Sequence, residues 1–210
     1  MPRATWLEDS KLWLVLDRAA AAPHSLVEAT ESALKGGVDV VVFRLKDTPQ
    51  EEVRRLAIPV CEICRRANMP FVISHEVALG LELGADAIHA GIGDGSLQSI
   101  REQIGNQMAL GYSAHSVAEA ALMLASGADY AFVGPIFPTP AKLKYGEPLG
   151  LEVVADASAL PKPVVFIGGI NQNTLPKLVA LGGRRIAAIA ALQSVPDITA
   201  AAKTMRSLLG

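Results

Sequence analysis

Two cations alternate at the end of an apolar segment, where Arg44 and Lys46 flank Leu45. Residues i and i+2 of an extended strand point to the same side, so the sequence predicts that both charges lie on one face. Two neighbouring cations in that position suit a phosphate or pyrophosphate group. The alternative is a pair of solvated charges at a strand end.

Small residues follow two other apolar segments. Gly168 and Gly169 come directly after one of them, and Ala190 and Ala191 come after the next. Residues without bulky side chains let backbone N–H groups approach an anion closely. The pattern predicts a second phosphate-binding site at these four positions, and a plain tight turn is the alternative.

Asp94 and His75 are the candidates for metal binding and for proton transfer. Asp94 lies in the segment Gly-Ile-Gly-Asp-Gly, and His75 follows Ser74 at the end of a short apolar run. One carboxylate in such a loop is able to hold Mg²⁺ together with substrate phosphates, although it is equally suited to cap the next helix. Histidine is an acid or base near neutral pH. We expect His75 to be catalytic, unless it only caps a helix or hydrogen-bonds a neighbour.

A loop rich in proline and glycine, roughly residues 135–150, contains Thr139 and Lys142. Loops of this length inside compact domains are often functional lids. Thr139 is therefore expected to bind an anionic ligand, and Lys142 is expected to reach the same ligand as a catalytic residue. A solvated loop is the alternative.

These residues must be positioned by eight apolar segments that alternate with helical ones. The predicted strands are residues 12–16, 38–44, 71–73, 87–90, 108–112, 130–133, 164–167 and 186–189. The predicted helices are residues 25–35, 49–67, 76–83, 97–104, 117–125, 151–158, 174–181 and 198–209.

Strands that alternate with helices indicate βαβ units and a parallel sheet, which is the α/β class. Eight such units favour a single (β/α)8 TIM barrel that occupies residues 1–210 as one domain. A doubly wound open sheet is the alternative, but no G-x-G-x-x-G follows the first strand. In a barrel, polar residues that follow the strands meet at one mouth, where such folds carry their sites. We therefore expect His75 to lie near Arg44, Lys46 and Asp94.

Composition excludes several classes of protein. The 210 residues are 50% apolar and carry a formal net charge of −2, which fits a folded domain and gives no electrostatic reason to bind nucleic acid. No apolar run reaches the roughly 18 residues that span a bilayer, so no membrane partner is expected. The first residues do not resemble a secretory signal, and we expect a cytoplasmic protein.

Two cysteines and two histidines are expected to have structural roles rather than chemical ones. Cys61 and Cys64 are spaced like a metal or redox pair, but they fall in a predicted helix with no second pair nearby, so they are expected to pack. His89 alternates in a buried strand and is expected to be a core histidine. His115 is expected to organise the start of a helix.

Several motifs, in matching order and spacing, resemble the thiamine phosphate synthase/TenI family over nearly the full chain. They are Leu-Trp-Leu-Val-Leu-Asp-Arg at 12–18, Gly-Ala-Asp-Ala-Ile-His-Ala-Gly at 84–91, Gly-Tyr-Ser-Ala-His-Ser at 111–116, the segment from Gly-Ala-Asp-Tyr to Thr-Pro-Ala-Lys at 127–142, and Ile-Gly-Gly-Ile-Asn-Gln-Asn-Thr at 167–174. The resemblance implies a (β/α)8 barrel. It also implies that a hydroxymethylpyrimidine diphosphate is joined to a hydroxyethylthiazole phosphate, with Mg²⁺ and release of pyrophosphate.

The chain departs from the synthase pattern on the side that the resemblance assigns to the pyrimidine diphosphate and the metal. The family's Asn-Asp after the third strand is replaced by Ser74 and His75, while Asp94 matches the second metal carboxylate. The family motif Gln-x-Arg-Glu-Lys keeps only its cations, Arg44 and Lys46. We therefore expect Mg²⁺-dependent synthase activity to be weak or absent.

The side assigned to the thiazole phosphate is better kept. Gly168, Gly169 and Thr139 match, whereas the serine after the last strand becomes Ala190. The characterised TenI tautomerase has a histidine after the sixth strand, and that position is Pro135 here.

Three hypotheses follow from the resemblance. The main one is a TenI-like enzyme that processes a phosphorylated thiazole ligand. The alternatives are a thiamine phosphate synthase and a non-catalytic protein that binds or senses a phosphorylated metabolite. A homodimer is an expectation from the family alone.

Overall fold

The computed structural model describes residues 5–139 and 147–210, and its centre is a closed barrel of eight parallel strands in sequence order. The strands are β1 (Leu12–Leu16), β2 (Val40–Phe43), β3 (Phe71–Ser74), β4 (Ala87–Ala90), β5 (Ala109–Ala114), β6 (Tyr130–Val133), β7 (Val164–Ile167) and β8 (Ile186–Ala188). Strand β1 pairs with both β2 and β8, which closes the barrel. The predicted TIM barrel is confirmed.

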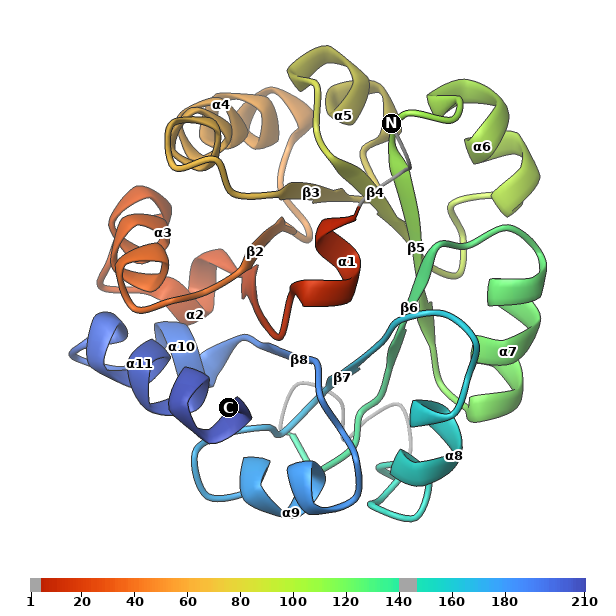
Figure 1. Cartoon of the computed structure of the whole chain (residues 1–210). Helices are drawn as coiled ribbons and strands as arrows, with labels where there is room; N and C mark the ends of the chain where they lie inside the picture. Colours follow the sequence, from red (N-terminus) through yellow and green to blue (C-terminus); the bar gives the residue numbers. More distant parts are fainter. Residues whose placement is uncertain (1–4, 140–146) are drawn as a thin grey trace.

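The helices form a ring outside the strands (Figure 1). They are α1 (Trp6–Asp9), α2 (Arg18–Ala21), α3 (Leu26–Lys35), α4 (Gln50–Arg66), α5 (Val77–Leu83), α6 (Leu97–Ile104), α7 (Val117–Ala125), α8 (Val154–Ser158), α9 (Leu175–Ala180), α10 (Ala190–Gln193) and α11 (Ile198–Leu209). Helix α1 is the exception, because it lies across the middle of the barrel in this view (Figure 1).

The strands are apolar on both faces because each face is covered. One set of alternating residues packs inside the barrel, and Trp13, Val42 and Val72 belong to it. The other set packs against the helices, as Leu14 does. Leu7 of α1 joins the inner set and closes one end of the barrel. This arrangement explains why the strands read as continuous apolar runs rather than as alternating ones.

The short helices were not expected. Residues of α1, α2 and α10 were predicted as loop or chain end, because four-residue helices carry too little periodicity to be visible in a sequence. Strand β2 was also expected to reach Arg44, but it ends at Phe43. Within the described residues, no helix is long and apolar enough to cross a membrane.

The repeated Gly-Ala-Asp motif has a structural purpose. It marks the turns from a helix into β4 and into β6. The carboxylate of Asp86 accepts a hydrogen bond from the backbone N–H of Phe71 at 2.8 Å, and Asp129 accepts one from Leu110 at 2.9 Å. Each aspartate therefore ties the start of its own strand to the preceding strand.

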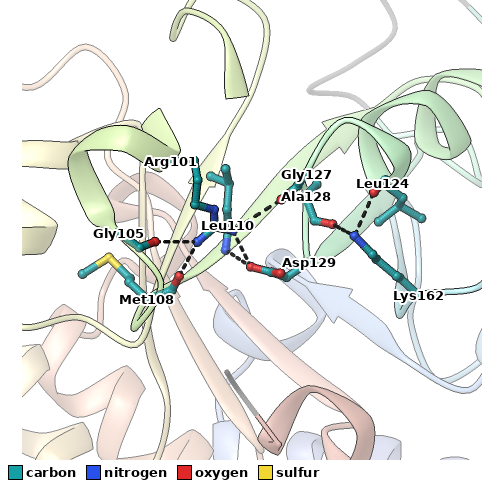
Figure 2. Close-up of polar contacts among 9 residues, drawn as sticks. All are labelled: Arg101, Gly105, Met108, Leu110, Leu124, Gly127, Ala128, Asp129 and Lys162. Carbon is teal, nitrogen blue, oxygen red and sulfur yellow. Dashed lines mark hydrogen bonds and ion pairs between the residues drawn. The ribbon is translucent and has the colours of Figure 1, made fainter. Parts of the chain in front are cut away.

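Arg101 extends this network at the start of β5 and β6 (Figure 2). Its guanidinium donates to the carboxylate of Asp129 at 2.6 Å and to the carbonyls of Gly105, Met108 and Gly127. Lys162 donates to the carbonyls of Leu124 and Ala128 nearby. These bonds satisfy carbonyl groups that the helix ends and turns would otherwise leave without donors.

Cys61 and Cys64 are both buried in α4. Burial raises the pKa of the Cys64 thiol to about 12, so it stays protonated near neutral pH. A buried, protonated thiol is neither a good nucleophile nor a metal ligand, and the structural interpretation of the pair is supported.

Candidate active site

The mouth at the carboxyl ends of the strands collects polar side chains from three neighbouring strands. Ser74, His89 and Ser113 have the same alternation as the inward-facing residues Val72 and Ala87, so they face the interior of the barrel. Register pairs Ser74 with His89. The apolar interior therefore ends in a polar layer at this mouth.

His75 and Asp94 are in direct polar contact at the mouth. The Nδ1 atom of His75 lies 2.6 Å from Oδ2 of Asp94, and the same oxygen accepts the backbone N–H of Gly91 at 2.7 Å. A Cβ on Gly91 would be 3.5 Å from Cε1 of His75 and 4.0 Å from Cβ of Ser113. His75, Asp94 and Ser113 thus surround one glycine, and the expectation that His75 lies beside Asp94 is confirmed.

The backbone of His75 is in the left-handed region, with φ at 71°. Histidine is among the few residues other than glycine that adopt this region, and such conformations are concentrated at functional sites. The turn is held by the backbone N–H of His75, which donates to the carbonyl of His89 at 3.1 Å. His75 does not cap α5, because Glu76 occupies the N-cap position of that helix. The side chain of His75 is instead hydrogen-bonded to Asp94.

The residues at this position do not form a magnesium site by themselves. Mg²⁺ requires oxygen ligands in octahedral geometry, and one of the two oxygens of Asp94 is already occupied by two hydrogen bonds. The neighbouring position offers the imidazole of His75 in place of a second carboxylate. Across residues 5–139 and 147–210, no three His, Cys, Asp or Glu side chains are grouped to hold a metal ion. Asp94 contributes at most one oxygen to an ion that arrives with a phosphorylated substrate.

Ser74 carries a hydroxyl with no partner in the described part of the chain. The residue is 4% exposed, and its Oγ atom is buried without a hydrogen bond. Buried polar atoms are nearly always satisfied by protein, water or ligand, so an orphan of this kind needs an explanation. Its position at the end of β3, facing the mouth, makes a ligand oxygen a fitting partner.

His89 is a buried histidine, as expected, but it has two polar partners that the sequence did not reveal. Its Nδ1 atom lies 3.2 Å from the hydroxyl of Tyr130, and its Nε2 atom lies 2.8 Å from Oγ of Ser113. Burial, together with the smaller effects of His75 and Arg44, lowers the pKa of His89 to about 3. The imidazole is therefore neutral near pH 7. Ser113 lies two residues beyond Gly111 in β5, and this period-two alternation places it on the inner face with His89.

Arg44 and Lys46 are not a pair on one face of a strand. Strand β2 ends at Phe43, and the backbone turns at Asp47, where φ is 52°. Arg44 is half-buried at the mouth, and burial lowers the pKa of its guanidinium, whereas Asp17 opposes that change. Lys46 is exposed. The alternation failed because it holds only while the strand is extended.

Gly168 and Gly169 have a structural reason to be glycine. Both have positive φ, at 96° and 66°. A Cβ on Gly168 would come within 2.5 Å of Pro135, and one on Gly169 would come within 2.6 Å of Cβ of Phe137. The close approach of the chain after β6 therefore requires both glycines, whether or not an anion binds there.

Ala190 and Ala191 begin α10, next to the end of β7 in the barrel. The first N–H groups of a helix have no acceptor within the helix, so these two are directed beyond its end. Thr139 is half-buried and is the last described residue before residue 147. Lys142 lies outside the described residues.

Comparisons with a family model, with known sequences and with solved structures all find similarity to the same kind of protein. The model of the thiamine monophosphate synthase family matches residues 12–192. The thiamine-phosphate synthase of Chloroflexus aurantiacus is 35% identical over 202 residues, which are 96% of this chain and 93% of that protein. The thiamine-phosphate synthase of Desulfitobacterium hafniense (strain Y51) is 36% identical over 201 residues, or 95% of this chain and 97% of that protein.

A solved structure with this fold is the thiamine phosphate pyrophosphorylase from Pyrococcus furiosus. It superimposes with a TM-score of 0.86 at 27% sequence identity and covers 97% of this chain and 96% of its own. Fold, length and the motifs at the strand ends thus lead to one conclusion. The chain belongs to the thiamine monophosphate synthase family.

Proposed function

We propose that this protein is a thiamine-phosphate synthase, which was the alternative rather than the main hypothesis from the sequence. The observation that carries the proposal is the end-to-end similarity to proteins named as synthases, at 35–36% identity. In this reaction the bond from the pyrimidine methylene carbon to the diphosphate oxygen breaks, and the thiazole nitrogen forms a new bond to that carbon. Pyrophosphate leaves with the electron pair.

The leaving pyrophosphate gains negative charge in the transition state, and fixed donors at that point accelerate the reaction. Arg44 supplies a positive charge in a half-buried position, where the charge is screened less than at the surface. Ser74 and Ser113 supply hydroxyls at the same mouth, and Asp94 accepts a hydrogen bond from Nδ1 of His75. We assign the pyrimidine diphosphate to this side of the mouth.

We assign the thiazole phosphate to the other side, where β7 and β8 end. Gly168, Gly169, Ala190 and Ala191 form that rim, and small residues leave its backbone accessible. Thr139 and Lys142 belong to the segment between β6 and α8 and are proposed to contact the same phosphate. The two substrates would then meet above the polar layer of the barrel.

The test is product formation from the two substrates together. The purified protein should form thiamine phosphate from the pyrimidine diphosphate and the thiazole phosphate, and neither substrate alone should yield it. Arg44→Gln should lower kcat by about a hundredfold, because it removes one charge contact to the leaving group. An Arg55→Gln variant, which loses an exposed cation on α4, should match the wild type. Absence of thiamine phosphate under single-turnover conditions would exclude the proposal.

A second candidate function rests on the contact between His75 and Asp94. A histidine whose Nδ1 is held by a carboxylate has its Nε2 atom available for proton transfer, which is the requirement for tautomerising a thiazole carboxylate phosphate. In that case His75→Asn should lose at least about a hundredfold in turnover while keeping ligand affinity, and His115→Asn should not. Loss of turnover only in His115→Asn would reject it. Binding without turnover in any form would instead favour a non-catalytic binding protein.

A further inference from the structure

His89, Tyr130 and Ser113 form a hydrogen-bonded series that leads from the sealed interior of the barrel to its mouth. Tyr130 and His89 are buried, at 0% and 3% exposure, while Ser113 is only half-buried. The rings are tightly packed, since the centroid of Phe132 lies 4.2 Å from that of His89. A Cβ on Gly111 would lie 2.1 Å from the Tyr130 ring, so Tyr130 rests directly on that glycine.

The direction of these hydrogen bonds follows from the chemistry of the groups. A neutral imidazole has one N–H donor and one acceptor nitrogen. Burial raises the pKa of Tyr130 well above its ordinary value, so its hydroxyl keeps the proton. The Nδ1 atom of His89 is the one hydrogen-bond partner of that hydroxyl in the described chain. If Nδ1 were protonated, the buried phenol hydrogen would have no acceptor, which is unfavourable. The phenol therefore donates to Nδ1, and the ring hydrogen sits on Nε2.

The hydrogen on Nε2 of His89 determines the role of Ser113 in the next hydrogen bond. Its Oγ atom accepts the Nε2–H of His89 at 2.8 Å, so its own hydrogen remains to be donated elsewhere. On its other side Ser113 borders Gly91, against which His75 also lies. The orphan hydroxyl of Ser74 is next to His89 in the register of β3 and β4 and independently indicates that a ligand completes this layer.

We infer that His89 and Tyr130 are positioning residues, which fix Ser113 as a hydrogen-bond donor to an anionic oxygen of the substrate. The inference rests on the proposed function for the identity of that oxygen, which would belong to the diphosphate. A serine hydroxyl free to rotate presents a lone pair or a hydrogen with similar ease, and only the hydrogen attracts an anion. The histidine and tyrosine do not touch the substrate themselves, and their effect passes through Ser113.

A double-mutant cycle tests this directly, with inorganic pyrophosphate as the probe and calorimetry as the readout. Tyr130→Phe keeps the ring but removes the donor, and Ser113→Ala removes the hydroxyl. Each should weaken pyrophosphate binding by about tenfold, and the double variant should bind no more weakly than either single one. Independent effects that multiply to about a hundredfold, or normal affinity in Tyr130→Phe, would overturn the inference.

Thr30→Val is the matched control for removing a buried hydroxyl. Thr30 is fully buried in α3, where its hydroxyl donates to the carbonyl of Leu26 at 2.7 Å. Its loss should lower stability without changing pyrophosphate affinity. In the wild type, ¹⁵N NMR of the His89 ring should show the hydrogen on Nε2, and a hydrogen on Nδ1 would also overturn the inference.

The outcomes separate this inference from the proposed function. A wild type that makes thiamine phosphate but gives an additive cycle keeps the function and loses the role of His89 and Tyr130. A wild type that gives the non-additive cycle but makes no thiamine phosphate loses the function and keeps that role. A wild type that fails to bind pyrophosphate rejects Ser113 as an anion donor.

Discussion

The Nδ1 atom of His75 lies 2.6 Å from Oδ2 of Asp94, and the imidazole N–H donates to this carboxylate, at the position where the family pattern implies two carboxylates. This contact changes what the mouth is able to bind. Two carboxylates attract a divalent cation and repel a diphosphate in its absence, whereas an imidazole paired with one carboxylate does neither strongly. The pair therefore predicts a weaker requirement for Mg²⁺ than a two-carboxylate site has.

His75→Asp should restore a strong magnesium site. Aspartate tolerates the left-handed backbone at this position, where φ is 71°, so the substitution should not disturb the turn. We expect Mg²⁺ affinity to rise by at least about tenfold and Mg²⁺-dependent turnover to rise with it. Calorimetric titration with Mg²⁺ and turnover at varied Mg²⁺ are the measurements. His115→Asp, which adds a carboxylate elsewhere, is the control, and equal Mg²⁺ affinity in both variants would contradict the interpretation of the pair.

Ala190→Asp should weaken phosphate binding at the rim of β7 and β8. Gly169 is unsuitable for this test because any side chain there collides with Phe137, while Ala190 is exposed and begins α10. The new negative charge should lower the affinity for inorganic phosphate by about tenfold or more. Ala190→Asn has nearly the same shape without the charge and should bind almost normally. Unchanged affinity in Ala190→Asp would mean that phosphate binds elsewhere.

The stability of the protein should depend on pH through His89. Its folded pKa of about 3 lies below the unfolded value of about 6.5, so between these values the unfolded chain binds more protons. The stabilising contribution is complete above about pH 6.5 and is lost progressively as the pH falls, by up to about 1.4 kcal/mol per pH unit. The measurement is urea unfolding at several pH values.

The matched comparison for that experiment is His89→Gln against His115→Gln. His89→Gln should be less stable at neutral pH, because it disturbs a packed ring, but should show a flatter dependence on pH below 6.5 than the wild type. His115 is exposed, and its replacement should leave the slope unchanged. Parallel slopes in the wild type and His89→Gln would show that His89 is not the responsible group.

Arg101→Ala should destabilise the fold by about 2–4 kcal/mol, because it leaves the largely buried carboxylate of Asp129 without its cation and several carbonyls without donors. Arg54→Ala should have a much smaller effect on the free energy of unfolding, because its ion pair with Glu82 is solvent-exposed. Chemical unfolding of both variants is the measurement. Equal losses would mean that the network in Figure 2 contributes no more than a surface ion pair.

Most of the barrel could be predicted from the sequence because its strands and longer helices are locally encoded. The strand Phe71–Ser74 is mostly apolar. The helix Leu26–Lys35 is preceded by its N-cap residue Ser25, which forms a capping box with Glu28 in the structure. Helix α10 could not be predicted, because four residues do not reveal a helical period. The end of β2 at Phe43 was missed for a related reason, since the residues that follow still read as alternating.

The candidate site could be predicted only where it depends on strand ends. His75 and Asp94 were expected near each other because both follow neighbouring strands of one barrel, and they touch. The partnership of His89 with Tyr130 could not be foreseen, since it joins residues 41 positions apart across two strands. The expected pairing of Arg44 and Lys46 on one strand face failed because β2 ends at Phe43 and the backbone turns at Asp47. The sequence has no clear signal for that turn.

If this mouth joins two phosphorylated substrates, it must release one pyrophosphate for each thiamine phosphate that it forms. A single-turnover experiment with the protein in excess over both substrates, in which thiamine phosphate and pyrophosphate are quantified together, measures this ratio. We expect both products to appear in equal amounts and at the same rate, and Arg44→Gln to slow them equally. Pyrophosphate release without thiamine phosphate, or neither product from a protein that binds both substrates, would contradict the proposed function.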